Sequence, residues 1–123
     1  MFNLRKEQLK IFETIAAKDF EQREVVHLRE HFPDQCSVLD EATLLEIILY
    51  GAERAKVYGI MAEGDVAKYI DVMFTLGKDF DRDSKYSWAA RTLSDPNLDG
   101  PGARIDRLWA EVLEVEGRKG TGA

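Results

Sequence analysis

The sequence is poor in the residues that cross-link or interrupt a chain. It has 123 residues, with a single cysteine, Cys36, and three prolines. A lone cysteine excludes a disulfide within the chain and favours a reducing compartment. No window approaches the 18 apolar residues of a membrane-spanning helix, and the first residues lack the apolar segment of a signal peptide. The sequence therefore predicts a cytoplasmic protein.

Positive charge is also in short supply. The chain carries 17 Lys and Arg residues against 23 Asp and Glu residues, a formal net charge of −6. Binding to nucleic acid or to anionic lipid needs a concentrated basic surface, so we expect neither kind of partner. Hydrophobic residues make up 45% of the chain, enough for a folded core. We expect a single helical domain over residues 1–116 and a disordered tail over residues 117–123.

Apolar residues recur at helical spacing, and no segment alternates long enough to predict a strand. A first helix is expected from residue 4 to His31, because Pro33 disfavours helical geometry before it. Its stripe begins with Leu9, Phe12, Ile15 and Ala16. A second helix is expected from an Asp40 N-cap to Gly59, which supplies a left-handed C-terminus. Its run of apolar residues favours a central place in a bundle: Leu44, Leu45, Ile47, Ile48 and Leu49.

Three further helices complete the expected fold. Acidic residues at 63 and 65 open a third helix that ends at Gly77. Asp83 is a candidate cap for a short helix around Trp88, and a loop over residues 94–102 precedes a last helix with apolar residues at 105, 108, 109, 112 and 113. The prediction is an all-α protein, a compact bundle of four to five mostly antiparallel helices.

Two short motifs are candidate metal sites. His27, Glu30 and His31 form H-x-x-E-H, which on a helix places both histidines on one face, able to hold zinc while the glutamate activates water. The acidic segment 79–83, with aspartates at alternate positions, resembles the start of a calcium loop. The glycine and glutamate that such a loop requires are replaced by Ser84 and Ala90, which argues against calcium.

The segment from Tyr58 to Trp88 carries a family resemblance. Its pattern is YGI, then E-x-D-V-x-x-Y-I-D-x-M-F-x-L-G-x-D-F-D-x-D, then WA. It resembles a family of small, uncharacterised bacterial proteins that are commonly encoded beside type VI secretion components or polymorphic toxins. The likeness extends over His27–Leu108, with Ser84 and Ser87 where the family pattern has prolines. The resemblance implies a genomic neighbourhood and no catalytic residues.

Together these features predict a non-catalytic protein-interaction module without a cofactor. It would be an accessory, adaptor or immunity-type partner of a secreted bacterial effector, and a monomer or homodimer. Aromatic and acidic residues converge around the acidic segment, and they predict an interaction surface made of Asp79, Phe80, Asp81, Arg82, Asp83, Trp88 and Arg104. The alternative is a small zinc-dependent hydrolase that uses His27, Glu30 and His31.

Overall fold

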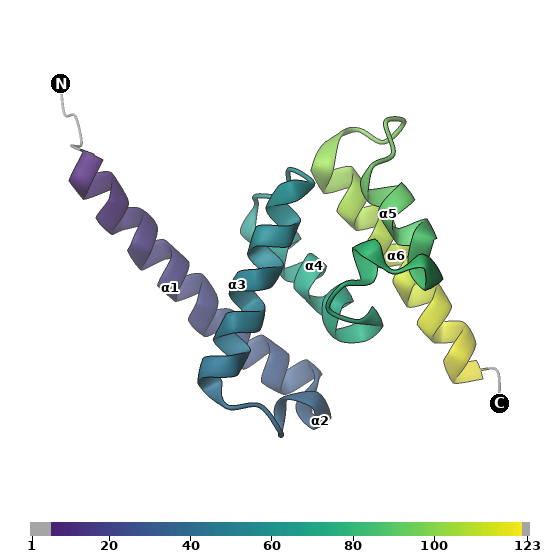
Figure 1. The fold of residues 1–123 in the computed structure, drawn as a ribbon, viewed down its shortest axis with the longest axis horizontal. Helices are drawn as coiled ribbons and strands as arrows, with labels where there is room; N and C mark the ends of the chain where they lie inside the picture. The colour runs from purple at the N-terminus through teal and green to yellow at the C-terminus, as the bar shows by residue number, and fades with distance from the viewer. Residues whose placement is uncertain (1–5, 122–123) are drawn as a thin grey trace. The chain divides into compact units, whose positions relative to one another are not determined.

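A computed structural model describes the backbone of residues 6–121 and the side chains of residues 17–117 (Figure 1). Six α-helices and two 3₁₀ helices occupy this part of the chain, which contains no β-strand. The predicted all-α fold is confirmed. The chain forms two compact units, residues 1–48 and 49–123, which divide within α3 (Glu41–Val57). One domain over residues 1–116 stays a prediction.

The first unit contains α1 (Lys6–His31), the one-turn helix α2 (Pro33–Cys36) and the start of α3. α1 ends where Pro33 predicts, and Pro33 then opens α2, where its missing N–H costs no hydrogen bond. Asp40 caps α3 by accepting from the Thr43 amide at 2.8 Å. The stripe predicted at Leu9, Phe12, Ile15 and Ala16 lies outside the described side chains. The described side chains that are buried in this unit include Val25, Leu28, Cys36, Leu44 and Ile48.

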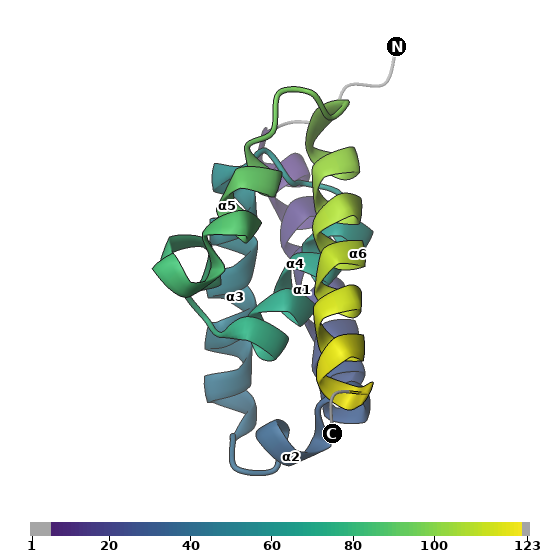
Figure 2. The ribbon, with the colours of Figure 1, turned by 90° about the vertical axis from the view of Figure 1, so that its right-hand side faces the viewer.

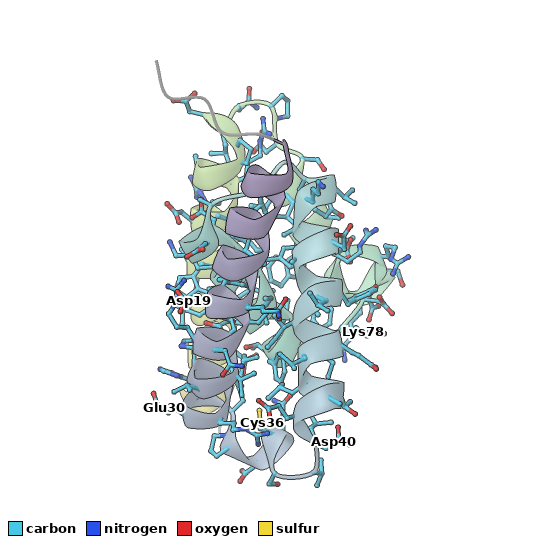
Figure 3. The ribbon with its side chains drawn as sticks, turned by 90° about the vertical axis from the view of Figure 1, so that its left-hand side faces the viewer. Asp19, Glu30, Cys36, Asp40 and Lys78 are labelled. Carbon is cyan, nitrogen blue, oxygen red and sulfur yellow. The ribbon has the colours of Figure 1, made fainter. Side chains whose placement is uncertain are left out.

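Figure 3 shows how this unit presents its polar and apolar side chains. The Cys36 side chain points inward from α2 and is 1% exposed, and its burial raises the pKa of the thiol. Asp19 and Glu30 extend outward from α1, and both are exposed. Cys36 is therefore part of the apolar interior. A buried thiol with a raised pKa is a weak nucleophile at neutral pH.

The second unit begins with the end of α3. The amide of Ile60 donates to the carbonyl of Ala55 at 3.0 Å, and the amide of Gly59 donates to that of Lys56 at 2.9 Å. This is the Schellman arrangement, which requires the positive φ of 76° at Gly59. Earlier in the helix, a Cβ on Gly51 would lie 2.7 Å from Ile70 Cγ1, so α3 approaches the next helix closely at this glycine.

That next helix, α4 (Glu63–Leu76), is the most buried element of the second unit. Seven of its side chains are buried: Val66, Tyr69, Ile70, Asp71, Val72, Met73 and Leu76. The sequence pattern had favoured α3 for the central place, but Leu49 on α3 is 51% exposed. Continuous apolar character therefore does not mean that every apolar side chain of α3 is buried. Gly77 ends α4 as predicted, with φ 126°.

The rest of the unit is η1 (Phe80–Arg82), η2 (Ser84–Tyr86), α5 (Ser87–Leu93) and α6 (Gly100–Thr121). α5 lies beside α6 (Figure 2) and runs antiparallel to it, as expected, because Thr92 bonds Glu111 while Arg104 bonds the Asp95 carbonyl. α4 and α6 run in the same direction, since Lys68 pairs with Asp106 and Asp65 faces Gly102. The α6 backbone continues past the expected boundary at residue 116 to Thr121.

Candidate functional site

The H-x-x-E-H segment lies at the end of α1. The rings of His27 and His31 stack with centroids 4.2 Å apart, and His31 Nδ1 donates to the His27 carbonyl oxygen at 2.9 Å. Glu30 is exposed. The two histidines do share a helix face, as predicted. Among the side chains described, however, no group of three or more His, Cys, Asp or Glu residues is placed to hold a metal ion.

The acidic segment builds a closed polar cluster in the second unit, which we define as Arg54, Tyr58, Tyr69 and Asp81. Asp81 Oδ2 forms an ion pair with Arg54 Nη2 and accepts from the Tyr58 hydroxyl at 2.8 Å. The Asp81 side chain is 0% exposed and that of Arg54 is 21% exposed. Phe80 is buried beside Tyr69, with ring centroids 5.1 Å apart. These contacts fasten η1 to the end of α3 and to α4.

The electrostatics of the closed cluster favour stability over chemistry. Burial raises the pKa of Tyr58 to about 12, and it also raises the pKa of Tyr69. The hydrogen bond to Asp81 raises the pKa of Arg54. Both phenols therefore stay protonated and the guanidinium stays charged at neutral pH, which leaves no general base among these three groups. Within the described part of the chain, Arg54 Nε, Tyr69 Oη and Asp81 Oδ1 have no hydrogen-bond partner.

A second, exposed set of contacts lies on the same elements. The Tyr50 hydroxyl donates to Asp79 Oδ1, and Arg82 Nη2 lies 2.7 Å from the same carboxylate oxygen. Lys78, labelled in Figure 3, places its Nζ 4.4 Å from the centroid of the Tyr50 ring. The hydrogen bonds to Tyr50 and Arg82 lower the pKa of Asp79. Arg82 therefore forms an ion pair with a neighbouring aspartate, Asp79.

The predicted interaction surface is divided by the fold. Phe80 and Asp81 are buried, so these two side chains do not belong to a surface, which corrects that part of the prediction. Asp79, Arg82 and Asp83 are exposed. Asp83 caps η2 by accepting from the Lys85 amide at 2.9 Å, one turn earlier than the α-helix it was expected to cap. The two remaining residues, Trp88 and Arg104, are half-buried.

Trp88 lines a groove of about 510 Å³ along α5 and α6, which we call the α5–α6 groove. Arg104 Nε donates to the Asp95 carbonyl at 2.8 Å and so holds one side of its wall. The lining comes from α5, from the loop after it and from one residue of α6: Trp88, Arg91, Thr92, Ser94, Asp95, Pro96 and Glu111. Because η1 packs against α5, the closed cluster and the groove share one structural support.

The polar groups of the groove are only partly used. The Thr92 hydroxyl donates to Glu111 Oε1 at 2.6 Å, and the Asn97 amide donates to Asp95 Oδ1 at 2.9 Å. Neither carboxylate forms an ion pair with a described residue, and neither does the exposed Arg91. The groove thus offers two carboxylates, a guanidinium and an indole ring to a ligand.

Several residues of both sites escaped the sequence interpretation. Arg54 was not singled out, although Tyr50, Arg54 and Tyr58 recur every four residues and so share one side of α3. That spacing was the available signal for a polar face. Arg91 and Glu111 carried no comparable signal, because they meet only through the antiparallel packing of α5 on α6.

Comparison with known proteins adds no assignment: no protein-family model, curated protein or solved structure matches the chain. Across the part of the chain that the structure describes, no helix is both long enough and apolar enough to cross a membrane.

Proposed function

We propose that this protein is a non-catalytic protein-binding module that acts in the cytoplasm as an accessory, adaptor or immunity-type partner of a secreted bacterial effector. The observation that carries this proposal is the α5–α6 groove. It combines a half-buried tryptophan with charged groups that have no ion-pair partner among the described residues. Tryptophan and arginine are the residues that contribute most to protein interfaces when a partner buries them.

Two features of the sequence support the same proposal. The formal net charge of −6 suits a basic partner, because complementary charge speeds association and disfavours acidic competitors. The resemblance of Tyr58–Trp88 to proteins encoded beside type VI secretion components and toxins points to an effector as that partner. The exposed members of the predicted surface, Asp79, Arg82 and Asp83, are carried by the segment that packs on α5.

The proposal is tested by recovering the partner from the native host with the full chain as tagged bait. We expect mass spectrometry to identify an effector encoded nearby, and we expect its recovery to fall sharply with Trp88→Ala. Trp109→Ala is the matched control, because Trp109 is half-buried on α6 but two positions from Glu111, about 200° around the helix.

Both variants must first give the helical circular dichroism of the parent protein. Recovery of no effector by the parent chain, together with normal secretion and survival of a deletion strain, would end the proposal. Equal recovery by the parent and the Trp88→Ala variant would reject the groove as the binding surface.

A further inference from the structure

The α5–α6 groove has the chemistry of a site for a positively charged side chain. We propose that it binds a single Lys or Arg side chain presented by a segment of the partner protein, held against the Trp88 indole and paired with the carboxylates of Glu111 and Asp95. This inference rests on the proposed protein-binding function and names the chemistry of the partner.

Trp88 and Glu111 both line the groove, and Thr92 links the α5 turn of Trp88 to the Glu111 carboxylate. Trp88 and Thr92 are four residues apart on α5, so they lie on one side of that helix. The Thr92 hydroxyl lies 3.0 Å from the Trp88 carbonyl oxygen and donates to Glu111 Oε1 at 2.6 Å. Glu111 is thereby held on the turn that carries the indole. An aromatic face beside a carboxylate is a favourable environment for an ammonium or guanidinium group.

The charges of the groove select the sign of the ligand. It contains the carboxylates of Asp95 and Glu111 but only one guanidinium, that of Arg91. None of these three forms an ion pair with any described residue. A cation entering the groove gains two carboxylates and meets one arginine, whereas an anion would gain one arginine and meet two carboxylates. The net charge of −6 over the whole chain adds attraction at longer range.

Arg91 narrows the specificity further. It lies three residues after Trp88 on the same side of α5, so a second basic residue beside the bound one would approach a like charge. The ligand is therefore an isolated basic residue, with a neutral or acidic neighbour, rather than a polybasic run. A volume of about 510 Å³ accommodates one long side chain and the backbone around it.

The test uses the full chain and short capped peptides of glycine and serine with one central guest residue. The guest is Lys, Arg, Gln or Glu, and a further peptide carries three consecutive lysines. Binding is followed by the two tryptophan indole N–H signals in nitrogen-resolved NMR spectra, with the Trp88 signal assigned through Trp88→Phe. We expect the single-Lys and single-Arg peptides to shift the Trp88 signal, and the Gln and Glu peptides to leave it in place.

Glu111→Gln separates a specific carboxylate from general attraction. The amide oxygen still accepts from Thr92, so the packing of α5 on α6 is kept while the charge is removed. We expect this variant to bind the Lys and Arg peptides about tenfold more weakly. Glu53→Gln, which removes the same charge from an exposed position on α3, is the matched control and is expected to change affinity less than twofold.

Several outcomes would overturn the inference: no shift of the Trp88 signal by any basic peptide, equal shifts by the Gln or Glu peptides, tighter binding of the three-lysine peptide, or equal losses from Glu111→Gln and Glu53→Gln. The proposed protein-binding function is tested separately from the basic ligand. Capture of an effector that depends on Trp88 but not on Glu111 would keep the protein-binding role and reject a basic side chain as the ligand.

Discussion

Two places in the second unit combine an arginine with at least one carboxylate and one aromatic ring, and they differ in whether the charged groups form an ion pair. In the closed cluster, the Asp81 side chain is 0% exposed and is bound by Arg54 and Tyr58. In the α5–α6 groove, Arg91 is exposed and has no ion pair within the described part of the chain, and Glu111 accepts only from Thr92 there. The same residue types therefore stabilise the fold in one place and leave capacity for a ligand in the other.

The difference arises from how the chain returns to each place. After Gly77 the backbone turns through η1, and the burial of Phe80 beside Tyr69 brings Asp81 under the end of α3. Arg54 and Tyr58 then enclose its carboxylate. α5, in contrast, ends after seven residues, and a loop of residues 94–99 connects it to α6. No side chain in that described stretch forms an ion pair with Glu111 or Arg91.

Replacing the arginine of the closed cluster is expected to cause the largest loss of stability and so tests the difference between the two places most directly. Arg54→Met keeps much of the aliphatic length but leaves the Asp81 carboxylate buried without its cation. Removing one partner of a buried ion pair typically costs about 3 to 5 kcal/mol. Because Arg54 is 21% exposed, we expect the lower end, about 3 kcal/mol, in the free energy of unfolding measured with urea.

The matched control is Arg91→Met, the same substitution in the groove. It breaks no ion pair with a described residue, so we expect a change within about 0.5 kcal/mol. A double variant, Arg54→Met with Asp81→Leu, should recover most of the lost stability, because no charge then stays buried alone. Equal losses at Arg54 and Arg91 would contradict the distinction between closed and open sites.

The features that sequence predicted well are those fixed by neighbours in the chain. Asp40 caps α3, Pro33 marks the end of α1 and Gly59 ends α3, because each depends on residues within one helical turn. These local signals sufficed for the all-α fold class and for most helix boundaries.

The features that sequence missed depend on residues far apart in the chain. Asp81 was assigned to a surface because aromatic and acidic residues converge around it, but Arg54 lies 27 residues earlier and pairs with its buried carboxylate. Trp88 was expected at a surface site, but the sequence did not indicate that Glu111 would line the same site. The packing of α5 on α6 brings Glu111 there. α3 was placed at the centre because its apolar run is continuous, and the exposure of Leu49 shows that periodicity alone does not reveal which helix is covered.

A second prediction concerns the helix contact beside the closed cluster. A Cβ at Gly51 would lie 2.7 Å from Ile70 Cγ1 and 2.9 Å from Met73 Sδ, so Gly51→Ala forces α3 and α4 apart or shifts these side chains. Overpacking of this kind costs about 1 to 3 kcal/mol, partly offset by the higher helix propensity of alanine, about 1 kcal/mol. We expect a net loss of up to about 2 kcal/mol in urea unfolding, and no gain.

Gly64→Ala is the control for that prediction. Gly64 is exposed in the first turn of α4, and a Cβ there meets nothing within 4 Å. The propensity gain then acts alone, and we expect stabilisation of up to about 1 kcal/mol. Stabilisation by both substitutions would show that α3 and α4 do not approach at Gly51 as closely as described.

The last prediction concerns the hydroxyl of Tyr58, and its effect depends on pH. Tyr58→Phe removes the hydrogen bond to Asp81 and, at neutral pH, should cost about 1.5 kcal/mol, the lower end for bonds to charged groups. Tyr50→Phe is the control, because its hydroxyl bonds the exposed Asp79, and we expect a change within about 0.5 kcal/mol.

The same phenol gives the pH window. Burial raises the pKa of Tyr58 to about 12, from about 10 in an unfolded chain. The folded protein thus holds this proton more tightly, so the stabilising contribution is complete below about pH 10 and falls as the pH rises toward 12. Urea unfolding across this range should show a shallower decline for Tyr58→Phe than for the parent, with Tyr69 still contributing in both because its pKa is also raised. An unchanged slope would place the Tyr58 hydroxyl in solvent and open the cluster that the structure closes.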